Sequence, residues 1–343
     1  MKLRAGRIFN RGPMALVAVM ALFVATPACS GASDPASRLP LTTLADVPLP
    51  GRATRWDYAS LDARNHHLFL AHLGDSAVVV FDTAKRKVMA TVPDVSHVHG
   101  VLYVPQLDRV YASATGTNEV IAIDARTFKI IARTHAGDYP DGMAYAPDVH
   151  KLYVSDEHGE TDTVIDVRSN SRVATIPLGG EVGNAQYDPT SKHIFANVQT
   201  RGQLMEIDPG TDKVISRIDL LGAKGNHGLY IDAASRLAFI ACEDNATLLV
   251  LDLHTHHVLA SFAVGGGPDV LAFDPSLGWL YVASESGVVS LFEVKGQNVR
   301  ELGRAMLGPN AHVVAVDPDM HRAYFPLKDV QGHPVLRIMQ PRS

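Results

Sequence analysis

The sequence predicts an all-β protein, a seven-bladed β-propeller. Two markers recur with one period of about 42 residues: an aromatic side chain at the centre of a short apolar run, and an acidic residue about 13 positions later. Each period also contains four runs of strand length and no helical pattern. Four strands in about 40 residues form the repeat of a propeller blade.

The aromatic marker occurs seven times, with successive spacings of 42, 42, 42, 44, 42 and 43 residues. Its positions are Phe69, Tyr111, Tyr153, Phe195, Phe239, Tyr281 and Tyr324. The acidic marker ends a hydrophobic run at Asp82, Asp124, Asp166, Asp208, Asp252 and Glu293. We interpret these acids as structural, because an Asp at the end of a strand can accept hydrogen bonds from backbone N–H groups of the next turn.

The third repeat illustrates the expected strands. They cover residues 142–146, 151–155, 162–165 and 172–176, and turn-forming residues separate them. The seventh repeat ends at its third strand, near residues 335–339, whereas residues 46–51 resemble the end of a fourth strand. We therefore expect an N-terminal strand to close the ring, which would pair an otherwise open sheet edge. Residues 41–343 are predicted to form one propeller domain.

The N-terminus has the pattern of an export signal. Basic residues up to Arg11 precede an apolar run over 14–24 and small residues over 26–32. Eleven apolar residues are too few to span a bilayer, so we expect a signal peptide over 1–32, a linker over 33–40, and a periplasmic or secreted protein without a transmembrane anchor. A lipoprotein signal ending before Cys29, with a lipid anchor on that residue, is the alternative.

Charge and cysteine content exclude several classes. Without residues 1–32 the chain has 27 basic and 36 acidic side chains, a net charge of −9, which argues against nucleic acid as a partner. Two cysteines are too few for a disulfide framework.

Several segments resemble a known family. Residues 55–58 (Arg-Trp-Asp-Tyr), 98–101, 140–143 and 268–271, with the recurring Leu-Tyr-Val-Ser cadence, are similar to the YncE-like, YVTN-repeat β-propellers. The resemblance covers about residues 41–340. It implies an exported propeller with a binding role, and DNA binding has been suggested for relatives. No catalytic signature of other propeller families, such as lactonases, is matched closely enough for residues to be carried over.

The best chemical signal lies at the start of the first strand of each blade. Counting back five residues from the first turn of each repeat gives a ring of equivalent positions, which we call the ring residues: Asp57, His99, Asp141, Gly183, His227, Asp269 and His312. Histidine and aspartate alternate except in the fourth blade, where Asn184 stands next to the glycine. First strands of a propeller surround its central channel, so these side chains are expected to face one another.

Three interpretations of the ring compete. It can be a polar, solvated channel in which His–Asp hydrogen bonds orient the blades. It can be a site for Zn²⁺ or Cu²⁺ made by His99, His227 and His312, with Asp57 or Asp269 as a ligand or as the partner that orients an imidazole. It can also be a hydrolytic or lyase site without metal, with a histidine as general base.

Further candidates for ligand contact are Asp141, Asn184, His97 and His158. The loops between second and third strands should open at the same mouth, which adds His72, Asp156, Arg201, Glu243, Asp244, Glu285 and Lys328. Two functions follow. The first is an exported binding or scaffold propeller that takes a small molecule or metal ion in its channel, with a possible protein partner on its faces. The alternative is a hydrolase or lyase of the lactone or ester type.

Overall fold

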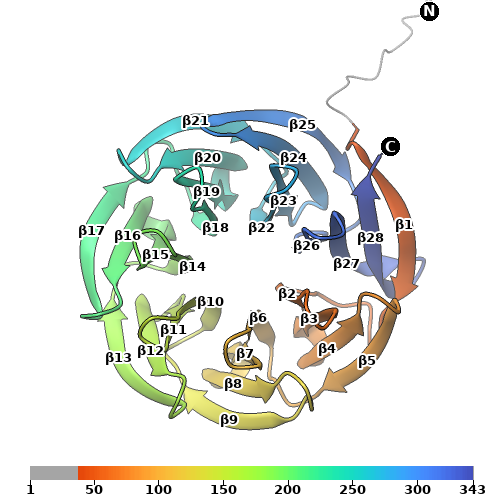
Figure 1. The fold of residues 1–343 in the computed structure, drawn as a ribbon, viewed down its shortest axis with the longest axis horizontal. Coiled ribbons are helices and arrows are strands. Elements are labelled where there is room, and N and C mark those ends of the chain that lie inside the picture. The colour runs from red at the N-terminus through yellow and green to blue at the C-terminus, as the bar shows by residue number, and fades with distance from the viewer. Residues whose placement is uncertain (1–37, 343) are drawn as a thin grey trace, which may run out of the picture. The chain divides into compact units, whose positions relative to one another are not determined.

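The computed structural model describes residues 38–342, which form seven four-stranded antiparallel sheets arranged as a ring (Figure 1). The predicted seven-bladed propeller is confirmed. The predicted signal peptide, Cys29 and residues 33–37 of the linker lie outside the described residues. Within the described chain, no helix is long and apolar enough to cross a membrane.

The two inner strands of each blade follow the order of the chain (Figure 1). The innermost strands are β2 (Ala59–Asp62), β6 (Val98–Val104), β10 (Pro140–Ala146), β14 (Val182–Asp188), β18 (Asn226–Asp232), β22 (Pro268–Asp274) and β26 (Ala315–Asp317). The second strands are β3 (His67–His72), β7 (Arg109–Ala114), β11 (Lys151–Asp156), β15 (His193–Val198), β19 (Leu237–Cys242), β23 (Trp279–Ser284) and β27 (Arg322–Val330).

The third strands are β4 (Ala77–Asp82), β8 (Glu119–Asp124), β12 (Thr161–Asp166), β16 (Gln203–Asp208), β20 (Thr247–Asp252), β24 (Val288–Lys295) and β28 (His333–Pro341). The outermost strands are β5 (Lys87–Val92), β9 (Ile130–His135), β13 (Ser171–Pro177), β17 (Lys213–Asp219), β21 (His257–Ala263), β25 (Asn298–Met306) and β1 (Leu41–Pro48). Single 3₁₀ turns follow four second strands: η2 (Leu73–Asp75), η3 (Thr115–Thr117), η4 (Gln199–Arg201) and η5 (Glu243–Asn245).

The outermost strand of the last sheet comes from the start of the described chain. Strand β1 pairs antiparallel with β28, from Leu41 opposite Pro341 to Pro48 opposite Val335. Arg337 on β28 donates to both carboxylate oxygens of Asp46, at 2.8 and 2.6 Å. Because β26, β27 and β28 belong to the same sheet, strands from both ends of the domain form one blade.

The core lies between neighbouring blades. All seven aromatic markers are at most 1% exposed, because each stands on a second strand that is covered on both faces by adjacent sheets. The five aspartates among the acidic markers cap the turns into the fourth strands, as the Asp124 carboxylate shows by accepting from the Arg126 and Thr127 backbone N–H groups at 3.0 and 2.8 Å. Glu293 instead binds the side chains of Lys295 and Arg300. The repeat therefore fixes each blade, and the first strands carry the residues of the channel.

Candidate functional site

Five of the ring residues lie at a local irregularity of the first strands, whereas Asp57 and His312 precede β2 and β26. In β6, β10, β14, β18 and β22 the pairing register shifts near the start of the strand, as between Val98 and Val101. A β-bulge of this kind re-aims a side chain. His99 lies inside the bulge of β6, and the next residue is Gly100. A Cβ atom at Gly100 would lie 2.3 Å from the carbonyl oxygen of Asp141, so only glycine permits the close approach of the next blade.

Six ring residues are buried polar or charged groups, and so is Asn184. Their exposed fractions lie between 0 and 9%. Five of them, Asp57, His99, Asp141, His227 and Asp269, line a cavity of about 520 Å³ that we call the polar chamber. Buried ionisable groups need partners, so their contacts determine what the chamber can bind.

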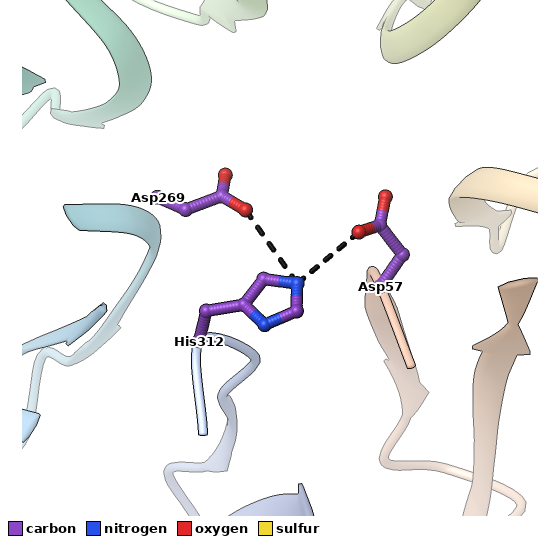
Figure 2. Close-up of side chains that lie close together, drawn as sticks. All are labelled: Asp57, Asp269 and His312. Atoms are coloured by element: carbon purple, nitrogen blue, oxygen red, sulfur yellow. Dashed lines mark hydrogen bonds and ion pairs between the residues drawn. The ribbon is translucent and has the colours of Figure 1, made fainter. Parts of the chain in front are cut away.

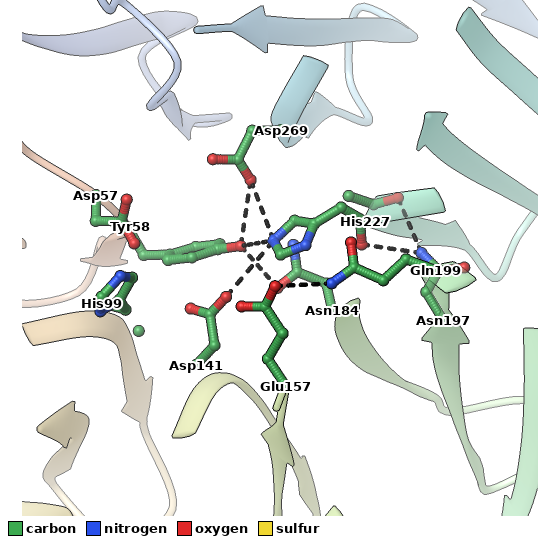
Figure 3. A network of polar contacts seen from close by, with 12 residues as sticks. Asp57, Tyr58, His99, Asp141, Glu157, Asn184, Asn197, Gln199, His227 and Asp269 are labelled. Atoms are coloured by element: carbon green, nitrogen blue, oxygen red, sulfur yellow. Dashed lines mark hydrogen bonds and ion pairs between the residues drawn. The ribbon is translucent and has the colours of Figure 1, made fainter. Parts of the chain in front are cut away.

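Tyr58 divides the channel. It lines the polar chamber and also a second cavity of about 340 Å³, the second chamber, whose lining residues come mostly from the first strands. The Tyr58 hydroxyl donates to Asn184 Oδ1 at 2.8 Å and lies 3.2 Å from His227 Nε2 and 3.3 Å from Asp269 Oδ1 (Figure 3). The side chain therefore reaches from the first blade to groups on β14, β18 and β22.

His312 forms the tightest cluster with carboxylates. Its Nδ1–H donates to the Asn310 carbonyl at 3.1 Å, and its Nε2 lies 3.1 Å from Asp57 Oδ1 and 3.7 Å from Asp269 Oδ2 (Figure 2). Burial by itself would lower the pKa of His312, but the hydrogen bond to Asp57 and the charge of Asp269 raise it above the ordinary value. A nitrogen that faces two carboxylate oxygens requires a cation, either a proton or a metal ion.

Arg55 binds the same carboxylate. Its Nε donates to Asp57 Oδ1 at 3.0 Å, and its other nitrogens contact Asp57 at 2.9 Å and Glu285 at the rim. Burial disfavours the charged form of Asp57, but the hydrogen bond from His312 and the neighbouring positive charges outweigh it, so the pKa of Asp57 lies well below its usual range.

His227 occupies a second cluster (Figure 3). Its Nε2 lies 3.5 Å from Asp141 Oδ2 and 3.6 Å from Asp269 Oδ1. Burial opposes protonation, but the charges of Asp269, Glu243 and Asp141 raise the pKa of His227 to about 9.

Three carboxyl groups of the chamber have raised pKa values. Burial raises the pKa of Asp141 to about 7, although nearby histidines oppose the shift. Burial likewise raises the pKa of Glu243 to about 7, against the effect of His227. The pKa of Asp269 is also raised, mainly by burial. The chamber therefore holds more carboxylates than its own cations neutralise.

His99 stands apart from both clusters. Its Nδ1–H donates to the His97 carbonyl at 2.9 Å, and its Nε2 lies 3.1 Å from the Tyr139 hydroxyl. Among the described residues, two groups have ligand atoms within 4.8 Å of one another: Asp57, Asp269 and His312, and His227, Glu243 and Asp269. The sequence analysis considered the three histidines as one ligand set. The structure instead groups two of them with carboxylates, and His99 with neither.

The other sequence candidates are distributed around the channel. His97 lines the polar chamber, as do the loop residues Glu243 and Glu285. His158 is not among the lining residues, but its ring packs on that of Tyr139 with centroids 4.2 Å apart. Asn184 lines the second chamber and accepts the Tyr58 hydrogen bond.

Sequence reasoning did not select seven of the lining residues as site candidates, and four of these have side chains that bear a charge or a phenol: Arg55, Tyr58, Tyr139 and Glu157. A signal for Tyr58 was present. The position after the ring residue carries glycine in three blades, at Gly100, Gly142 and Gly228, and no larger side chain than valine or asparagine in three others. The aromatic side chain in the first blade therefore stands out. Arg55 precedes Asp57 by two residues, as expected for side chains on the same side of an extended segment.

Comparison with known proteins supports the propeller fold and identifies neither a family nor a function. A solved structure of hydrazine synthase from Kuenenia stuttgartiensis is similar to this chain with a TM-score of 0.72, over 86% of this chain and 97% of that chain, at 16% sequence identity. At this identity the similarity shows the propeller fold alone. No protein-family model and no curated protein matches the chain, so membership of the YncE-like family remains an expectation.

Proposed function

We propose that the protein is a binding propeller that holds a divalent transition-metal ion in its central channel, between His312, Asp57 and Asp269. The supporting observation is the orientation of His312: its Nδ1–H is bound to a backbone carbonyl, and its Nε2 is directed at two carboxylate oxygens (Figure 2). A metal-ligating histidine usually has its second nitrogen held in this way.

The separations suit a small ion. Bonds of about 2.0–2.1 Å in a tetrahedral site place ligand atoms about 3.3 Å apart, and the Nε2 of His312 lies 3.1 and 3.7 Å from the two carboxylate oxygens. Imidazole and carboxylate ligands favour Zn²⁺ or Cu²⁺. Arg55 would compete for Asp57, but its side chain is 37% exposed and also binds Glu285, so it can withdraw without losing every partner.

The competing interpretation is a protonated His312 that merely joins the blades. An imidazolium would satisfy the same two carboxylates, and the raised pKa of His312 fits this state as well. The two interpretations differ in metal content, because only one of them uses the cluster to hold an ion.

Metal titration separates the two. Tag-free protein is dialysed against Zn²⁺ or Cu²⁺, and bound metal is measured for wild type, His312→Ala and His254→Ala. His254 is an exposed imidazole next to β20 and serves as the matched control. We expect wild type and His254→Ala to bind metal with the same affinity and His312→Ala to lose at least 10-fold in affinity. Equal binding by all three proteins would refute the proposed site.

A hydrolase or lyase of the lactone or ester type is the second candidate. It is favoured by the two carboxyl groups of the polar chamber whose pKa values, about 7 for Asp141 and Glu243, suit proton transfer at neutral pH. Turnover of chromogenic esters or lactones that falls at least 100-fold in Asp141→Asn would support it, and equal turnover in that variant would exclude this role for Asp141.

We also propose that the mature protein acts outside the cytoplasm. Support comes from the N-terminal pattern of basic, apolar and small residues. A binding role in the periplasm or outside the cell agrees with a channel that opens to solvent, and it leaves the propeller faces available for a protein partner.

A further inference from the structure

Asp269 lies between the two histidine clusters. Its Oδ2 atom is 3.7 Å from His312 Nε2, and its Oδ1 atom is 3.6 Å from His227 Nε2. One carboxylate thus presents a different oxygen to each imidazole. Figures 2 and 3 show the two sides of this carboxylate. A carboxylate in this position is the usual bridge between paired metal ions, which lie about 3.5–4 Å apart.

The second cluster has its own ligand set. His227 comes from β18, Glu243 from the start of η5 and Asp269 from β22, so two adjacent blades contribute. Their ligand atoms all lie within 4.8 Å of one another. Asp141 Oδ2 approaches the same His227 nitrogen at 3.5 Å from a third blade. This set is again imidazole with carboxylates, and it does not include Asp57.

Charge balance argues for more than one ion. Six carboxylates and one guanidinium line the polar chamber, from Asp57, Asp141, Glu157, Glu243, Asp269, Glu285 and Arg55. When metal ions displace the protons of the buried carboxyl groups and the histidines are neutral, these side chains carry five negative charges in total. One divalent ion reduces this to three and two ions reduce it to one. Concentrated like charge in a low-dielectric cavity is unfavourable, so a second cation stabilises the ionised ligands.

We propose that the channel holds a pair of divalent metal ions bridged by Asp269 at the wall of the polar chamber. His312, which is fully buried and is not one of the lining residues, and Asp57 would bind one ion, and His227 and Glu243 would bind the other. This inference rests on the proposed function, since it adds a second ion next to the first. The rest of the cavity, about 520 Å³ in total, then leaves room for a ligand that bridges the two ions.

The number of zinc ions bound per chain tests the proposed pair of metal ions. Tag-free protein is dialysed against Zn²⁺, and zinc per folded chain is measured for wild type, Glu243→Gln and Glu157→Gln. Glu157 is the matched control, because it lines the same chamber but belongs to neither ligand group and instead accepts a hydrogen bond from Gln199 at 2.9 Å. We expect two zinc ions in wild type and Glu157→Gln, and one in Glu243→Gln.

Each other result is informative. One ion in wild type, or two in Glu243→Gln, would overturn the pair but leave the single site. No ion in wild type would overturn both proposals. Copper gives a second measurement that does not depend on a variant folding: two Cu²⁺ ions bridged by Asp269 should give a magnetically coupled signal in electron paramagnetic resonance, whereas two independent signals would refute the shared carboxylate.

Discussion

Replacing Asp162 by valine should stabilise the propeller. Asp162 is 0% exposed on β12, and neither of its carboxylate oxygens has a hydrogen-bond partner within the described part of the chain. The equivalent third-strand positions in five other blades are aliphatic and buried: Val78, Val120, Leu204, Leu248 and Val289. Asp162 therefore places a carboxyl group at a buried position where five other blades have valine or leucine.

The magnitude follows from the burial. Leaving a buried polar group without a hydrogen bond costs about 1–3 kcal/mol in mutational data, and the two valine methyl groups add apolar burial of about 0.8 kcal/mol per carbon. We expect Asp162→Val to raise the free energy of unfolding by about 3 kcal/mol, which is about 6 °C in Tm for a domain of this size.

The difference in free energy of unfolding between Asp162→Val and wild type should also increase as the pH rises. Burial, together with the charge of Asp156, raises the pKa of Asp162 well above its ordinary value. The folded state therefore binds a proton that the unfolded state has released, and the stability of wild type falls as pH rises from about 4 toward the folded pKa, by up to about 1.4 kcal/mol per pH unit. Valine removes this dependence.

Denaturant unfolding of both proteins at pH 4.5, 6 and 7.5 provides the assay. Val120→Asp, which introduces the same carboxyl at the same position of the neighbouring blade, serves as the reciprocal control and should destabilise. The reasoning would be refuted by an Asp162→Val variant that is no more stable than wild type at any of the three pH values, or by a difference that shrinks as pH rises.

Three further predictions concern other parts of the chain. Tyr58→Phe should lower the free energy of unfolding by about 1 kcal/mol, because Asn184 loses the hydrogen bond that crosses the channel; an unchanged denaturation midpoint would contradict it. Deleting residues 41–48 should abolish the single cooperative melting transition, because it exposes the edge of β28; calorimetry of the truncated protein is the check. Intact-mass measurement on protein from the native host should place the mature N-terminus between Cys29 and Ser33; retention of residue 1 would disprove cleavage, and a diacylglycerol mass on Cys29 would establish the lipid anchor.

The blades could be predicted from sequence because the same packing recurs in each of them. An aromatic residue such as Tyr153 is buried between sheets in every blade. Because each blade needs a large apolar side chain at the same position, the aromatic residues recur in the sequence with the period of the blade. The strands of the third repeat begin and end within two residues of the expected positions, for example β11 at Lys151–Asp156. The ring residues followed from the same alignment, since a fixed offset from the first turn selects equivalent positions.

The contacts between side chains of different blades across the channel do not repeat from blade to blade, so the repeat could not predict them. Which imidazole meets which carboxylate depends on the width of the channel and on the one side chain that crosses it, Tyr58. His227 and His312 therefore pair with Asp269 rather than with each other, and His99 turns to Tyr139. The contact of Arg55 with Glu285 could not be predicted for the same reason, because the two residues are 230 positions apart in the sequence.

Tyr58 also makes the two ends of the propeller chemically independent. The Tyr58 ring lines both chambers and its hydroxyl is bound to Asn184, so this side chain has to move before a molecule can pass beside it from one chamber to the other. A ligand of the polar chamber is then expected to enter and leave by the same mouth, where Arg55 and Glu285 form an ion pair at the rim. The opposite face of the propeller can therefore bind a different partner without contact with a ligand in the polar chamber.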